Sequence, residues 1–342
     1  MSTIAPSVFA TATGIGSWPG TSAREAAGVV VGELHTLTHL VELPGRGVGA
    51  DLIGRAGALL VDIAIDTVPR GYRITPRPGA VARRASSLLG EDLDALEEAW
   101  EKAGLGGSAR PVKVQAPGPI TLAAELETGS GHRAITDLGA LRDLTASLAE
   151  GIAVHRAEVA RRLGTDVVVQ LDEPLLSAAL LGRLTGVTGI TPVHPVDEAL
   201  AVELLDTCVA AAGTAVAVHS CSAELPWKLF QRSTISAVSV DISTLAAADL
   251  DGIGEFLEAG RTVLLGVVPA LEPAPRPTVD EVAAAAAQIT DRLGFARTVL
   301  QERVGVTPAC GLAGATPGWA RTAVGLAQKV ADRFEQDPET NS

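Results

Sequence analysis

Short apolar or β-branched runs recur along the chain, each followed by a glycine, proline or polar turn and then by a stretch with helical spacing of apolar residues. Eight of these runs are predicted to be strands: Phe9–Gly16, Leu34–Leu43, Val112–Pro117, Val167–Leu171, Ala215–His219, Ala237–Asp241, Val263–Val268 and Val306–Cys310. Strands that alternate with helices pair in parallel, and eight such units favour closure. The pattern therefore predicts an α/β fold, a (β/α)8 TIM barrel.

The helices between these strands carry clear end signals. Apolar residues at helical spacing predict a helix over Asp137–Leu163, and Gly164 is predicted to end it. Thr278 and Glu281 have the spacing of a capping box, which predicts a helix that continues to Leu300. These signals place helices where the barrel requires them.

Two stretches do not fit the repeat, and one of them, Leu271–Pro277, is a short proline-rich loop. Arg70–Gly107 lies between the second and third predicted strands and is long enough for an extra helix around Asp92–Ala103. Thr316 and Pro317 provide a cap and a first-turn proline for the last helix. No proline-rich or polar linker divides the chain, so residues 1–342 are predicted to form a single barrel domain with a helical insertion after the second strand.

Composition and charge exclude several classes of function. The chain has 27 Lys and Arg against 40 Asp and Glu, a net charge of −13, which argues against a nucleic-acid partner. No apolar run reaches the roughly 18 residues of a membrane span, and the first residues lack the basic start of a signal peptide. Three cysteines, an odd number, fit a reducing cytoplasm.

Reactive side chains gather at the carboxyl ends of the predicted strands, where barrel enzymes build their active sites. They are Ser17, Glu42, Asp172, His219, Cys221, Asp241 and Cys310. His219 and Cys221 are two residues apart, so both can reach one ion. In a closed barrel, Cys310 and Asp241 reach the same rim. Two thiolates, an imidazole and a carboxylate suit Zn²⁺, and the sequence predicts a zinc site here.

Other candidates are weaker. Cys208 lies in an amphipathic helical stretch and is predicted to be a buried apolar residue. His35 and His39 have helical metal-site spacing, but the intervening segment lacks the glutamate of the HExxH pattern. No glycine-rich nucleotide-binding motif is present.

Short motifs along the chain resemble those of a known family. Seven motifs occur in the family's order: GIGSWPG (14–20), VELPGRG (41–47), PGPITL (117–122), QLDEP (170–174), HSCS (219–222), VSVDIS (238–243) and PACGL (308–312). The chain resembles the C-terminal catalytic barrel of cobalamin-independent methionine synthase, within the wider uroporphyrinogen-decarboxylase-like superfamily. The resemblance covers nearly the whole chain.

The resemblance implies a zinc-dependent methyltransferase that converts homocysteine to methionine, with methyltetrahydrofolate as the default methyl donor. It implies zinc ligation by His219, Cys221, the carboxylate of the next strand (Asp241) and Cys310, the set already reached from the strand ends. It also implies that three further residues bind homocysteine: Ser17, Glu42 and Asp172.

Three departures from the family concern the fourth ligand and the donor. Asp241 stands where the family has the longer glutamate, and Glu125 stands where it has a tryptophan that stacks on the folate. The stretch GVVPALEP lacks the family's acid histidine, so no catalytic acid is assigned. Two alternatives therefore remain open: a thiol methyltransferase whose donor is a corrinoid protein carrying methylcobalamin, and a catalytically silent zinc-binding barrel.

Overall fold

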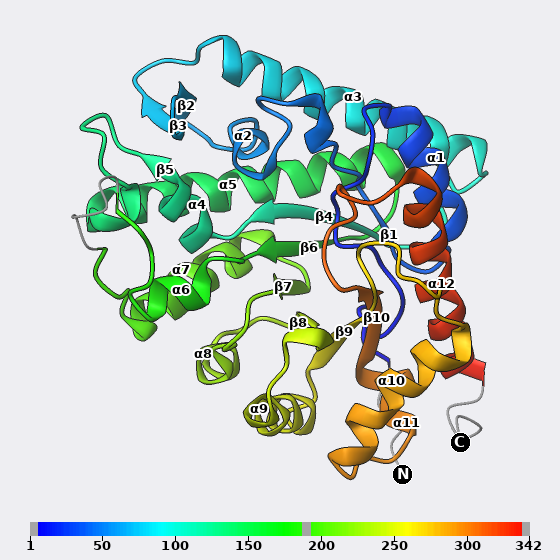
Figure 1. The fold of residues 1–342 in the computed structure, drawn as a ribbon. Coiled ribbons are helices and arrows are strands. Elements are labelled where there is room, and N and C mark those ends of the chain that lie inside the picture. Colours follow the sequence, from blue (N-terminus) through cyan, green and yellow to red (C-terminus); the bar gives the residue numbers. More distant parts are fainter. Residues whose placement is uncertain (1–5, 187–192, 337–342) are drawn as a thin grey trace.

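The computed structural model describes residues 6–186 and 193–336, and its centre is a parallel sheet that curls into a barrel wall (Figure 1). The sheet order is β1-β4-β6-β7-β8-β9-β10. Its strands are β1 (Thr38–His39), β4 (Val112–Pro117), β6 (Val167–Asp172), β7 (Val216–Ser220), β8 (Ala237–Asp241), β9 (Thr262–Val268) and β10 (Val304–Pro308). All neighbouring pairs in this sheet are parallel, as the alternation of strands and helices predicted.

The segment predicted as the first strand closes the wall between the two edge strands. Ala12 forms a parallel bridge to Val306 in β10, and Ser17 forms one to Glu42 just beyond β1. The segment is otherwise irregular, and the strand predicted over residues 34–43 shrinks to the two residues of β1. The (β/α)8 barrel is confirmed, with its first two strands the least regular.

Twelve helices surround this wall in the described parts of the chain. They are α1 (Ala23–Glu33), α2 (Leu52–Ala56), α3 (Ala80–Lys102), α4 (Pro119–Glu125), α5 (Leu138–Leu163), α6 (Leu176–Leu180), α7 (Glu198–Ala212), α8 (Trp227–Arg232), α9 (Ala247–Glu258), α10 (Val279–Arg292), α11 (Thr298–Arg303) and α12 (Pro317–Gln336). Within residues 6–186 and 193–336, no helix has the combination of length and apolar character needed to cross a membrane.

The predicted helix ends are mostly confirmed. Gly164 ends α5 at a φ of 66°, and the Thr278–Glu281 capping box opens α10. The continuous helix expected up to Leu300 is wrong, because Gly294, at a φ of 77°, turns the chain after α10 and a separate α11 follows.

The insertion is larger than the sequence indicated. Its helix α3 begins at Ala80 rather than near Asp92, and an antiparallel hairpin of β2 (Ala64–Val68) and β3 (Gly71–Thr75) precedes it. The short β5 (Leu126–Glu127) adds to β3 and ties the hairpin to the end of α4. In Figure 1 this insertion lies on one side of the barrel, above α5, so it borders the loops that follow β1.

Candidate active site

Six of the seven predicted site residues line one cavity of about 270 Å³ at the carboxyl ends of the strands. They are Ser17, Glu42, Asp172, His219, Cys221 and Cys310. Because parallel strands all end at the same rim, residues almost 300 positions apart in the chain meet there. The remaining wall is mostly apolar and includes Ala50 and Leu52 from the insertion side.

His219, Cys221 and Cys310 form a compact group in the wall of this cavity. Their ligand atoms all lie within 4.8 Å of one another, and the two Sγ atoms are 3.4 Å apart. Ser239 Oγ lies 3.2 Å from His219 Nδ1 and orients the ring, whereas the buried Nε2 has no hydrogen-bond partner among the described residues. Sulfurs bound tetrahedrally to one zinc are roughly 3.5–4 Å apart. The group therefore fits a soft divalent cation.

The two cysteines have opposite pKa shifts. The Cys310 thiol donates a hydrogen bond to Cys221, which lowers the pKa of Cys221 to about 7. The same donated bond and burial raise the pKa of Cys310 to about 12. The pair thus stabilises one thiolate, and a cation beside both sulfurs would displace the remaining proton.

Asp241 does not belong to this close group. It is the last residue of β8, and its Oδ1 accepts a hydrogen bond of 2.8 Å from the Ser243 amide at the start of a 3₁₀ turn. The Asp241 carboxylate thus caps the turn that follows its own strand. Its role as the fourth zinc ligand remains a prediction.

Two buried carboxylates line the same cavity as the sulfur atoms. Glu42 is 6% exposed and Asp172 is 7% exposed. Burial raises the pKa of Glu42 to about 7, against the opposing effect of the nearby Arg55. Burial also raises the pKa of Asp172, which His219 and Lys113 partly offset. Two desolvated carboxylates in one cavity are suited to a cationic group of a ligand.

A buried polar ladder beneath Asp172 was not found from the sequence. Gln170 Nε2 donates to Asp172 Oδ1 at 2.7 Å, and Lys113 Nζ donates to Gln170 Oε1 at 2.5 Å. Lys113 also donates to the Ile15 carbonyl oxygen at 3.1 Å, and burial lowers its pKa to about 7. The available signal was a lysine and a glutamine inside strands in which every residue is buried. The ladder fixes the direction of the Asp172 carboxylate.

The GIGS turn places Ser17 by backbone contacts on two sides. The Trp18 amide donates to the Glu42 carbonyl oxygen at 2.8 Å, and the Leu312 amide donates to the Ser17 carbonyl oxygen at 2.9 Å. A Cβ on Gly311 would lie 2.0 Å from Ser17 Oγ, so only glycine permits this approach. Ser17, Glu42 and Cys310 are therefore held together at the closure of the barrel.

The residues expected on the donor side lie elsewhere or are absent. Glu125 ends α4, with its side chain 41% exposed and 3.8 Å from Arg133, and it does not line the cavity. Of the histidines in the described residues, only His219 lines the cavity. No histidine follows β9, and the cavity wall contains no aromatic residue.

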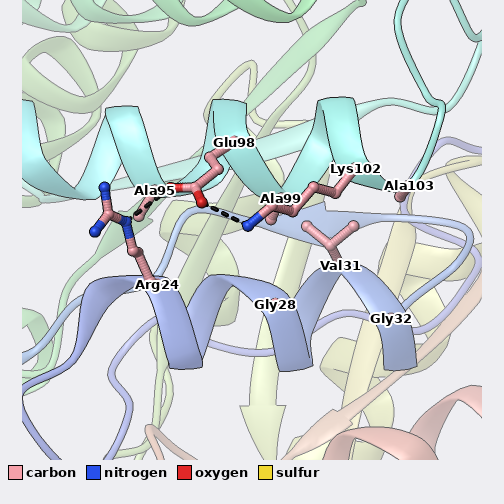
Figure 2. A pocket seen from close by; sticks show the side chains of 9 residues that line it. All are labelled: Arg24, Gly28, Val31, Gly32, Ala95, Glu98, Ala99, Lys102 and Ala103. Atoms are coloured by element: carbon pink, nitrogen blue, oxygen red, sulfur yellow. Dashed lines mark hydrogen bonds and ion pairs between the residues drawn. The ribbon is translucent and has the colours of Figure 1, made fainter.

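The weaker candidates lie away from this cavity. Cys208 is 1% exposed on α7, as predicted, and His39 is buried in β1. His35 Nε2 lies 3.0 Å from Asp332 on the surface. Figure 2 shows a separate pocket of about 340 Å³ between α1 and α3, where glycine and alanine line the floor and Glu98 pairs with Arg24 and Lys102. This pocket contains no group of potential metal ligands.

The fold and the site define a class of protein: a parallel barrel whose rim gathers a His-Cys-Cys group and two buried carboxylates in one cavity. The chain belongs to the family described as the cobalamin-independent synthase catalytic domain, whose model matches residues 9–333. This confirms the resemblance found in the sequence and makes the chain a member of a methyltransferase family of methionine biosynthesis.

Solved structures with the same fold agree. A B12-independent methionine synthase from Shewanella sp. W3-18-1, in complex with selenomethionine, superposes with a TM-score of 0.62 at 13% identity. A putative vitamin-B12 independent methionine synthase from Listeria monocytogenes superposes with a TM-score of 0.57, also at 13% identity. Each alignment covers 97% of this chain and 99% of the other. No curated protein sequence matches the chain.

Proposed function

We propose that this protein is a zinc-dependent methyltransferase that transfers a methyl group to the thiol of homocysteine and so forms methionine. One observation carries the proposal. A single cavity is lined both by the His219, Cys221 and Cys310 group and by the buried carboxylates of Glu42 and Asp172. A thiol-bearing amino acid carries the two complementary groups, sulfur and ammonium, at its two ends.

The size of the cavity and one similar structure support this substrate. A cavity of about 270 Å³ suits a small amino acid, since drug-sized ligands occupy roughly 300–1,000 Å³. The Shewanella protein was solved with selenomethionine, an analogue of methionine. We therefore place homocysteine, and then methionine, in the corresponding cavity of this chain.

The residues of the chain would act as follows. Glu42 and Asp172 bind the substrate ammonium, and Lys113, through Gln170, keeps Asp172 oriented. Ser17 and neighbouring backbone amides bind the substrate carboxylate. His219, Cys221 and Cys310 would hold the zinc, and Asp241 would be the fourth ligand.

A bound zinc ion would keep the substrate sulfur as a thiolate, the nucleophilic form, at neutral pH. Overall, the S–H bond of homocysteine is replaced by an S–CH₃ bond, and the thiol proton leaves to solvent or to the donor. Ser239 fixes the His219 ring so that its free Nε2 points to the metal side.

Residues 1–342 would act as one catalytic domain, because the family model spans 9–333. The unpaired cysteines support a cytoplasmic location.

Calorimetry with homocysteine tests the proposal directly. Binding to the zinc-loaded chain should release about one proton per homocysteine at neutral pH, because a thiol becomes a thiolate. Titrations in two buffers of different ionisation enthalpy measure this release, and methionine formation with methyltetrahydrofolate and methylcobalamin measures transfer. Binding without proton release, or no methionine with either donor, would contradict the proposal.

A further inference from the structure

A line of buried charges connects the insertion helix α3 to the cavity. Asp92 on α3 is completely buried and accepts two hydrogen bonds from Arg46 Nη2, at 2.7 and 2.8 Å, and one from Arg55 Nη1. Arg55, on α2, is itself 5% exposed, and its Nε lies 3.5 Å from Glu42 Oε1. A helix outside the barrel thus reaches a cavity-lining carboxylate through one arginine.

Arg55 lies close to Glu42 but forms no hydrogen bond with its carboxylate. The Nε–Oε1 separation of 3.5 Å is longer than an N–H···O hydrogen bond, and no hydrogen bond joins the two side chains. Arg55 Nε and Nη2 have no hydrogen-bond partner in the described residues, although both are buried. Unconstrained, a guanidinium this close would form a bidentate pair with the carboxylate. Its bond to Asp92 restrains it, and both Glu42 oxygens remain available.

We propose that Asp92 and Arg55 are positioning residues that keep Glu42 charged and unoccupied, so that the site selects thiols carrying an ammonium group. This inference rests on the proposed role of Glu42 as the ammonium anchor. Arg55 supplies the positive charge that favours ionised Glu42. Asp92 holds the Arg55 guanidinium back, so that the guanidinium does not take the place of the substrate ammonium at the Glu42 carboxylate.

The charges around Glu42 are finely balanced, which is why each one matters. Arg55 on α2 and Lys113 on β4 favour the carboxylate, whereas Asp172 on β6 and Asp92 on α3 oppose it. Together with burial, these effects leave the pKa of Glu42 at about 7. At such a value, the loss of one neighbouring cation leaves the group largely protonated at neutral pH.

Paired ligands test selection for ammonium. Homocysteine and γ-mercaptobutyrate have the same thiol, chain length and carboxylate, but only homocysteine has an ammonium. Calorimetry on zinc-loaded protein should show homocysteine binding about tenfold more weakly to Asp92→Asn and Arg55→Met, since each impairs the same anchor. Binding of γ-mercaptobutyrate should change less than about twofold, because this ligand makes no use of Glu42.

Two further variants separate positioning from folding. Arg55→Lys retains the charge and should restore most of the homocysteine affinity, and Asp94→Asn, an exposed site on the same helix, should behave as wild type. In turnover, Asp92→Asn should raise KM for homocysteine more than it lowers kcat. Equal weakening of both ligands, or unchanged homocysteine binding in both Asp92→Asn and Arg55→Met, would overturn the inference. Wild-type protein that binds both ligands equally would instead contradict the proposed role of Glu42.

Discussion

At the scale of single residues, the sulfur atoms of Cys221 and Cys310 make the site most sensitive to substitution. We expect Cys310→Ser to lose most of its bound zinc, because a serine hydroxyl is a poor ligand for this borderline-soft ion. Cys208→Ala, which changes a buried cysteine outside the cavity, should keep its zinc. Elemental analysis of the purified chains measures both, and unchanged zinc in Cys310→Ser would remove the proposed site.

The charge on Glu42 gives the site a pH dependence with a definite sign. Its pKa of about 7 means that acid would convert the proposed ammonium anchor to a neutral carboxyl group. Homocysteine affinity, relative to γ-mercaptobutyrate, should therefore fall as pH decreases below about 7, by up to about tenfold per pH unit. Protonation of the cysteines and of the ligand thiol weakens both ligands alike, so its effect cancels in the ratio of the two affinities. In Glu42→Gln the ratio should be low and nearly flat, and a wild-type ratio independent of pH would contradict the assignment.

The residues that could be predicted were those with a recognisable position at the end of a strand. An apolar run precedes each of Ser17, Glu42 and Asp172, and the HxC spacing of His219 and Cys221 indicates a metal site. Arg55 and Asp92 had no such signal, because they lie in an insertion whose path over the barrel only tertiary packing reveals. Their alignment with Glu42 depends on three separate segments meeting.

At the scale of elements, buried parallel strands were predicted well because their apolar runs are continuous. The boundaries of β4 and of β6 to β10 differ from the predicted ones by at most two residues, whereas the short β5 was not predicted. The β2–β3 hairpin was missed because its strands alternate with charged residues such as Asp66 and Arg73, so no apolar run appears. Its buried residues are Ala64, Ile65 and Tyr72. The Tyr72 hydroxyl donates a hydrogen bond to Asp51 and accepts one from the Gly49 amide, in the loop that lines the cavity.

Packing of the insertion on the barrel helices gives a stability prediction. A Cβ on Gly151 of α5 would lie 1.9 Å from the Leu59 carbonyl oxygen, whereas a Cβ on Gly28 of α1 would meet nothing within 4 Å. Gly151→Ala should therefore destabilise by about 1–3 kcal/mol, because backbone must shift to admit the methyl group. Gly28→Ala should stabilise by about 0.4–1 kcal/mol through the lower entropy of the unfolded chain. Denaturant unfolding measures both, and equal effects would show that α5 and the insertion are not tightly packed.

At the scale of the whole molecule, closure of the barrel creates the site. The first segment of the chain joins β10 to the end of β1, and this juxtaposition brings Ser17 and Glu42 beside Cys310. The same rim lacks groups that a folate donor would use, since Glu125 lies outside the cavity and no histidine follows β9. The residues proposed to bind the thiol substrate therefore line the cavity, whereas the groups that the resemblance associates with a folate donor do not.

The lack of an aromatic residue and of an acid histidine in the cavity predicts which methyl donor is preferred. Loss of an aromatic platform removes stacking of roughly 1–3 kcal/mol per ring, and loss of a general acid slows proton delivery to the leaving nitrogen by about 10²–10⁴-fold. Methylcobalamin needs no such proton, because the electron pair of the Co–C bond stays on cobalt as the methyl group passes to sulfur. We therefore expect the purified chain to turn over methylcobalamin faster than monoglutamyl or triglutamyl methyltetrahydrofolate. Steady-state rates at saturating homocysteine and full zinc loading decide this, with Cys310→Ser measuring the uncatalysed reaction of methylcobalamin with the thiol. Efficient turnover of the triglutamate by the isolated chain would mean that other groups of the rim bind the pterin and protonate its nitrogen.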